Sequence, residues 1–172
     1  FLYPFLHWFT LILAIPSCML LCRFFVIQHD CGHYSFFTER KHNKLAGLIL
    51  GFFTLVPSRV WNYIHDTHHG KVGNLDERKA NPELWTMTVH EYKNASFLKR
   101  FFYRIFRSMF MRLFITPLIW MLAPRIPIPQ LGSKILSSIM AHNVIYAAIL
   151  TIIISKGVFL PFVIIYLLPV YL

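Results

Sequence analysis

Acidic residues are scarce in this chain of 172 residues, which has seven Asp and Glu against 17 Lys and Arg and a formal net charge of +10. Charged residues of both signs make up only 14% of the chain, whereas 56% is hydrophobic and 17% is aromatic. A soluble domain of this size has too little interior to bury so much apolar surface. The composition therefore excludes an ordinary soluble domain and indicates a membrane protein.

Cysteine and glycine are also too few for two common kinds of architecture. The three cysteines, Cys18, Cys22 and Cys31, are an odd number and two of them lie in an apolar run, so they form no disulfide framework. The pattern G-x-G-x-x-G does not occur, and so no dinucleotide site is encoded in these residues. Any reducing equivalents that the protein uses must come from elsewhere.

The basic residues are concentrated in the middle of the chain. Fifteen of the 17 Lys and Arg residues fall between Arg40 and Lys134. Such a concentration between apolar spans is typical of a cytoplasmic face. Anionic lipid headgroups explain the charge more simply than a nucleic acid does, so we expect no nucleic-acid partner.

Long apolar runs lie at both ends of the chain and predict an all-α integral membrane protein. Residues 4–28 and 135–155 are each long enough to span a bilayer as a helix, which takes about 20 residues. Residues 158–172 begin a third span, and residues 155–157 form the turn between the second and third. The chain begins with Phe1 and stops at Leu172 inside an apolar run, and we interpret both termini as truncated.

The central region predicts interfacial helices that form a cytoplasmic cap. Residues 45–56 are apolar but too short to span, which favours an interfacial or re-entrant helix. A helix over residues 59–69 should end at Gly70, and residues 71–96 read as a polar loop with short helical pieces. Residues 97–121 predict one amphipathic helix with arginines on one side. It suits a lipid surface, or alternatively the docking of an acidic electron carrier.

Two histidine clusters supply five of the nine histidines in the chain. The first reads H-D-C-G-H over residues 29–33, and the second reads H-D-T-H-H over residues 65–69. On a helix, residues three or four apart share a face, so each cluster can direct its imidazoles at one point. A single histidine near an apolar segment is usually just hydrogen-bonded, but two such clusters 31 residues apart are not explained that way. The candidate ligands are His29, His33, His65, His68 and His69.

Imidazole binds iron, zinc, copper and nickel, and five rings exceed what one tetrahedral zinc ion takes, so a pair of redox metal ions is favoured. Asp30 and Asp66 each follow the first histidine of a cluster. Their carboxylates are placed to accept the N–H groups of ligating rings and so to fix the orientation of those rings. Salt bridges with nearby Arg or Lys side chains are the alternative role for both.

The two clusters and the residues around them resemble the membrane fatty acid desaturases, which carry three histidine boxes around a di-iron centre. The segment V-I-Q-H-D-C-G-H at residues 26–33 resembles the first box, and residues 65–69 resemble the second. L-V-P at residues 55–57, Trp61, G-N-L-D at residues 73–76, T-V at residues 88–89 and E-Y at residues 91–92 resemble the acyl-lipid omega-6 and omega-3 enzymes. The resemblance covers most of residues 20–130, and no third box occurs before Leu172.

The resemblance implies that residues 1–172 are a partial desaturase-like membrane domain. It implies oxygen-dependent desaturation of fatty acyl chains, with the five histidines among the ligands of two iron ions and O2 as co-substrate. Further expectations are a membrane lipid or acyl substrate, ferredoxin or cytochrome b5 as electron donor, and a multi-pass protein with its histidine boxes on the cytoplasmic face. Asn143 resembles a position at which the family carries an asparagine near the metal, although a helix–helix hydrogen bond explains this residue as well.

Two other interpretations remain open for the sequence. A carotenoid ketolase or hydroxylase, or an alkane hydroxylase, shares the histidine-box chemistry but inserts oxygen; the D-C-G-H and G-N-L-D segments favour a desaturase. The chain is alternatively an inactive membrane fragment, because it holds five expected ligands where the family uses eight or more. We therefore expect these 172 residues alone to be inactive.

Overall fold

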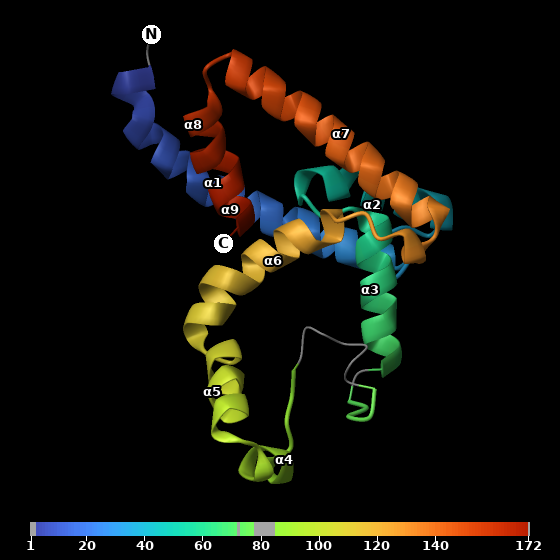
Figure 1. Cartoon of the computed structure of the whole chain (residues 1–172). Helices are drawn as coiled ribbons and strands as arrows, with labels where there is room; N and C mark the ends of the chain where they lie inside the picture. Colours follow the sequence, from blue (N-terminus) through green and yellow to red (C-terminus); the bar gives the residue numbers. More distant parts are fainter. Residues whose placement is uncertain (1–2, 72, 78–84, 172) are drawn as a thin grey trace. The chain divides into compact units, whose positions relative to one another are not determined.

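The computed structural model describes residues 3–71, 73–77 and 85–171, and the secondary structure of these residues is helical with no strand (Figure 1). This agrees with the all-α class expected from the sequence. The chain divides into two compact units, one made of residues 1–61 and 120–172 and the other of residues 62–119. The helix α3 begins in the first unit and continues into the second.

Two long apolar helices belong to the first unit, α1 (Tyr3–Gly32) and α7 (Ser133–Ser155). By length and composition, Leu11–Gly32 and Ser133–Ser155 are each able to cross a membrane. Many of their apolar side chains are exposed, among them Met19 at 68% and Val144 at 64%, so much of their surface is available to lipid. Both agree with the predicted spans, and α1 continues four residues beyond residue 28, into the first histidine cluster.

A short apolar helix follows α7 after a tight turn. Gly157 has a positive φ of 67°, and its N–H group donates to the carbonyl of Ile154 at 3.0 Å. The chain then forms α8 (Phe159–Phe162), the π-helical turn η6 (Val163–Leu167) and α9 (Leu168–Tyr171). The turn expected over residues 155–157 is therefore present. The third apolar helix, Phe159–Tyr171, is shorter than the two candidate spans, and Leu172 lies outside the described residues.

The helices α2 (Arg40–Phe53) and α3 (Ser58–Lys71) are joined by a sharp bend of 107°. The bend is tight because Gly51 lets the backbone approach closely: a Cβ atom there would lie 2.6 Å from Oγ of Ser58 and 2.8 Å from the carbonyl oxygen of Val56. The hydroxyl of Ser58 in turn donates to the carbonyl of Gly47. The interfacial or re-entrant helix expected over residues 45–56 corresponds to the later part of α2, which ends at Phe53, and to the bend that follows it.

The expectation that Gly70 ends the second histidine helix is wrong, since α3 runs through Gly70 to Lys71. A glycine stops a helix when it adopts a positive φ. Gly73 does so with a φ of 82°, whereas Gly70 stays helical, and a Cβ atom added there would meet nothing within 4 Å.

The second unit contains α4 (Val89–Asn94), α5 (Phe97–Phe106), the π-helical turn η3 (Met111–Ile115) and the start of α6 (Thr116–Leu122). The single helix expected over residues 97–121 is wrong, because the chain bends by 55° between α5 and the segment that starts at Met111. The hydroxyl of Ser108 accepts the N–H group of Met111 at 3.2 Å, which caps a new helix start. The loop expected over residues 71–96 contains α4, and residues 72 and 78–84 lie outside the described part.

Candidate metal centre

The first histidine pair lies at the end of α1. His29 is in the last turn of the helix and His33 directly follows Gly32, and their ring centroids are 4.7 Å apart. The ring of Trp61, in the first turn of α3, lies edge-on to His29 with the centroids 5.5 Å apart. Cys31 is buried at 2% exposure, and its Cβ atom lies 3.7 Å from the position that a Cβ atom on Gly47 would take.

The second pair lies on one face of α3, one helical turn apart. The Nε2 atoms of His65 and His69 are 3.0 Å from each other, and the ring centroids are 4.4 Å apart. Without a metal ion, one of two imidazole nitrogens at this distance donates an N–H hydrogen bond to the other. With a metal ion, both nitrogens can direct their lone pairs at that ion. The spacing of four residues on a helix accounts for this geometry.

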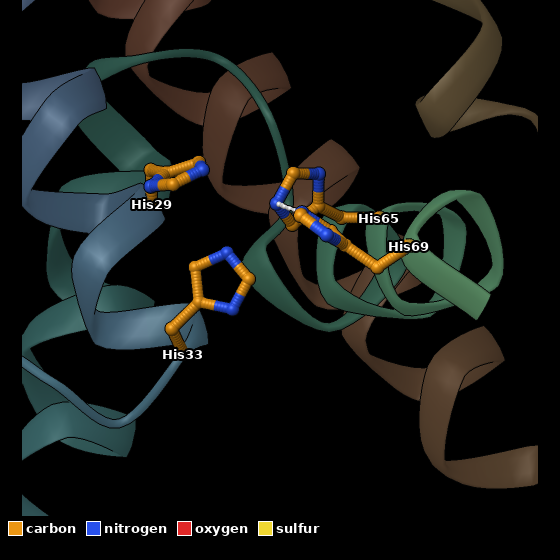
Figure 2. A group of neighbouring side chains, drawn as sticks. All are labelled: His29, His33, His65 and His69. Carbon is orange, nitrogen blue, oxygen red and sulfur yellow. Dashed lines mark hydrogen bonds between the residues drawn. The ribbon is translucent and has the colours of Figure 1, made fainter. Parts of the chain in front are cut away.

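Four histidines form the group that the structure offers to a metal ion: His29, His33, His65 and His69. One ligand nitrogen from each lies within 4.8 Å of every other, and Figure 2 shows the rings turned toward one another. Imidazole nitrogens bound about 2.1 Å from one ion are about 3 Å apart when adjacent and about 4 Å apart when opposite. The observed group is wider than this, so the rings would move closer together on binding one ion. This set of neutral nitrogen donors therefore fits a first-row transition metal.

His68 stands outside this group of four. Its ring centroid is 6.4 Å from that of His65 and 5.9 Å from that of His69. Its Nδ1 atom is buried and has no hydrogen-bond partner within the described part of the chain. Buried ring nitrogens ordinarily find a partner, so Nδ1 of His68 is an atom that a ligand or ion would satisfy. The fifth predicted ligand remains a prediction.

The three residues expected around the metal have different surroundings. The carboxylate of Asp30 lies 3.1 Å from Nδ1 of His29, the contact expected of a group that orients a ligating ring. Asp66 is exposed and has no hydrogen-bond or ion-pair partner among the described residues. The side-chain amide of Asn143 donates to the backbone carbonyl of Arg125 at 2.9 Å, which is the hydrogen bond between helices that we considered as the alternative.

Gln28 is a buried polar residue beside the first pair to which the sequence analysis assigned no role. It is 1% exposed, its Nε2 donates to the carbonyl of Val56 at 3.2 Å, and its Oε1 accepts from the hydroxyl of Thr54 at 2.5 Å. It thereby ties the end of α1 to the bend before α3. The sequence feature that could have identified this role is an amide side chain next to His29, at the end of a largely apolar run.

Comparison with known proteins agrees with this donor set. The family model described as "Fatty acid desaturase" matches residues 5–172. The chain belongs to the fatty acid desaturase family. No solved structure matches the chain.

Curated relatives in the family are similar to parts of the chain. A fatty acid desaturase of Bacillus subtilis (strain 168) is 38% identical over 109 residues, which are 63% of this chain and 31% of that protein. An sn-1 acyl-lipid omega-3 desaturase (ferredoxin) of Nostoc sp. (strain 36) is 41% identical over 71 residues, 41% of this chain and 19% of that protein. An sn-1 oleoyl-lipid 12-desaturase of Picosynechococcus sp. is 39% identical over 69 residues, 38% of this chain and 20% of that protein. The chain thus spans less than a third of the length of these relatives.

Proposed function

We propose that the protein to which this chain belongs introduces a double bond into fatty acyl chains at a pair of iron ions, with O2 as co-substrate. The observation that carries the proposal is the group of four histidine nitrogens within 4.8 Å of one another, in a chain of the desaturase family. The proposed ligands from this chain are His29, His33, His65, His68 and His69. Residues 1–172 then form a partial desaturase domain, and by themselves are inactive because the ligand set is incomplete.

The chemistry explains why such a protein needs a metal. Breaking an unactivated C–H bond in an acyl chain requires an oxidant far stronger than any side chain, and O2 activated at iron supplies it. The side chains of this protein hold the ions, orient the ligating rings and exclude water. The Asp30 carboxylate beside His29 supports such an orienting role.

The electron balance calls for a partner. Forming one double bond removes two hydrogen atoms from the acyl chain, and reducing O2 to two waters consumes these and a further two electrons and two protons. We propose ferredoxin or cytochrome b5 as the donor. The name of the Nostoc relative, which specifies ferredoxin, supports the first of these.

We further propose that α1 and α7 cross the membrane in a multi-pass arrangement, with the histidines at its cytoplasmic face. The exposed apolar surfaces of both helices and the basic residues between Arg40 and Lys134 support this orientation. Ligands at the end of a spanning helix are accessible to a substrate that is itself a membrane lipid.

The test is an exchange of His65 for Ala in the full-length enzyme, expressed in a host that lacks its own desaturase for the same lipid. We expect loss of the new unsaturated acyl chains and of bound iron, since His65 belongs to the group of four. His90→Ala is the matched control, because His90 lies on α4 and contacts Asn94 at 3.0 Å. An unchanged lipid profile in the His65→Ala enzyme would refute the proposal.

A further inference from the structure

The bend between α2 and α3 leaves a row of backbone carbonyls without helical partners. α2 ends at Phe53 and α3 begins at Ser58, so the carbonyls in the last turn of α2 and in the bend accept few bonds from either helix. Leu55, in the middle of the bend, is 6% exposed and has a positive φ of 61°, which is uncommon for a leucine. Buried carbonyls need donors, and such a backbone persists only when its surroundings hold it.

Four side chains from four separate elements donate to these carbonyls. The hydroxyl of Tyr146 in α7 donates to the carbonyl of Phe52. The hydroxyl of Tyr166 in η6 donates to the carbonyl of Phe53 at 2.7 Å. The guanidinium of Arg125, in the short helix η4 (Ala123–Arg125), donates to the carbonyl of Leu55, and Gln28 in α1 donates to that of Val56.

The donors are themselves held in place. The guanidinium of Arg125 lies over the ring of Tyr146, 4.2 Å from its centroid, and its Nε donates to the carbonyl of Met121 at 3.1 Å. The amide of Asn143 donates to the backbone carbonyl of Arg125. A cation at the C-terminal end of α2 also interacts favourably with the partial negative charge of that helix end. The bend is therefore held by hydrogen-bond donors whose own positions are fixed by other contacts.

The direction of α3 determines where its histidines lie. His65 and His69 are seven and eleven residues beyond Ser58, so at about 1.5 Å per residue their Cα atoms are about 10 and 16 Å from the start of the helix. A tilt of about 5° at the bend moves them by about 1 Å. Metal–ligand distances tolerate only about 0.2 Å.

We propose that Arg125, Tyr146 and Tyr166 are positioning residues that fix the angle between α2 and α3, and thereby the place of His65 and His69. None of the three belongs to the histidine group. They act through the backbone carbonyls of residues 52–55. The effect on metal affinity rests on the proposed function, whereas the effect on the angle does not.

The first test measures the angle without any metal. Spin labels are attached at Leu45→Cys in α2 and Tyr63→Cys in α3, both exposed positions, in the full chain in lipid nanodiscs with its three native cysteines replaced by Ala. We expect the distance distribution between the labels to broaden in the double variant Tyr146→Phe/Tyr166→Phe, which loses only two hydroxyl groups. A distribution equal to that of the parent would overturn the proposal.

The matched control is Tyr34→Phe, since the Tyr34 hydroxyl makes no hydrogen bond among the described residues and the ring stays under Arg40. The second test measures Co(II) affinity by equilibrium dialysis. We expect the double variant to bind Co(II) about tenfold more weakly or worse at unchanged helix content, and Arg125→Lys to lose less affinity than Arg125→Met. Equal affinity in variant and parent would count against the proposal. A parent that bound no Co(II) would refute the metal site, and the label distances alone would then decide the inference.

Discussion

The carboxylate of Asp30 lies 3.1 Å from Nδ1 of His29, the residue directly before it. A carboxylate at this position accepts the Nδ1–H group and so fixes the ring as the tautomer whose Nε2 lone pair can bind a metal. In the proposed metal centre, two adjacent residues would thus provide a ligand and the group that orients it.

Replacing Asp30 by Ala should therefore weaken metal binding by about 10- to 100-fold, the usual cost of losing such an orienting partner. Asp30→Asn should cost less, since the amide oxygen still accepts from Nδ1–H. Asp66→Ala is the control, because Asp66 is exposed and has no partner among the described residues. Titration with Co(II), followed by its visible absorption, measures all three. Equal losses for the Asp30→Ala and Asp66→Ala variants would contradict this prediction.

The two neighbouring histidines of α3 should differ in importance. His69 belongs to the group of four and His68 does not. In this chain, His69→Ala should lose most bound metal, while His68→Ala should retain more of it. Metal content after dialysis, measured by inductively coupled plasma mass spectrometry, gives the comparison. A proposed ligand whose ring lies outside the group of four should contribute less to metal binding than one inside it, and equal losses in the two variants would contradict this ranking.

Gly51 should tolerate no side chain. A Cβ atom there would lie 2.6 Å from the Ser58 hydroxyl oxygen and 2.8 Å from the Val56 carbonyl, and one of these contacts is with backbone that cannot easily move. Gly51→Ala should destabilise the protein by about 1–3 kcal/mol, the usual cost of overpacking. The control is Gly70→Ala in α3, where nothing lies within 4 Å, and it should be neutral or stabilising by up to about 1 kcal/mol. Thermal unfolding in detergent, followed by circular dichroism, compares the stabilities of the two variants. A Gly51→Ala variant as stable as the parent would argue against the tight bend.

One side of α5 should lie against lipid. Leu98 and Phe102, which are four residues apart and share a face, are 60% and 53% exposed, whereas Tyr103 packs against Trp85 with ring centroids 5.3 Å apart. Exposed aromatic side chains beside lysine and arginine are typical of a helix in the membrane interface. A bimane label at Phe102→Cys should be quenched by doxyl-labelled lipids more strongly than one at Arg100→Cys, because residues two apart on a helix point to nearly opposite sides. Quenching that is stronger at Arg100→Cys would reverse the orientation.

Local patterns in the sequence were sufficient for the long helices and for the approximate place of the histidines. Continuous apolar runs predicted α1 and α7, and the spacing of four residues predicted that His65 and His69 share a face, which depends only on helix geometry. The break after α5 was missed because the hydroxyl of Ser108 competes for the start of a new helix, a choice that hydrophobic periodicity does not contain.

The hydrogen bonds that hold the α2–α3 bend could not be predicted from the sequence, for a different reason. Arg125 reaches a carbonyl 70 residues earlier in the chain, and Tyr146 one 94 residues earlier. Arginine and tyrosine near apolar helices have many conceivable partners, and only the fold selects the carbonyls of Leu55 and Phe52. Within the candidate site, the position of His68 outside the group of four depended likewise on the direction in which each ring points.

The length of α1 has a consequence for the lipid environment. From Leu11 to His29 the helix rises about 27 Å, close to the roughly 30 Å of hydrocarbon in a typical bilayer. A rigid helix answers a thicker or thinner bilayer by changing its tilt or by deforming the lipid around it. If α1 spans the membrane, bilayer thickness sets the depth of His29 and His33 below the headgroups. The acyl chains around the protein would then determine how deep the proposed metal centre lies in the membrane, in addition to supplying its substrate.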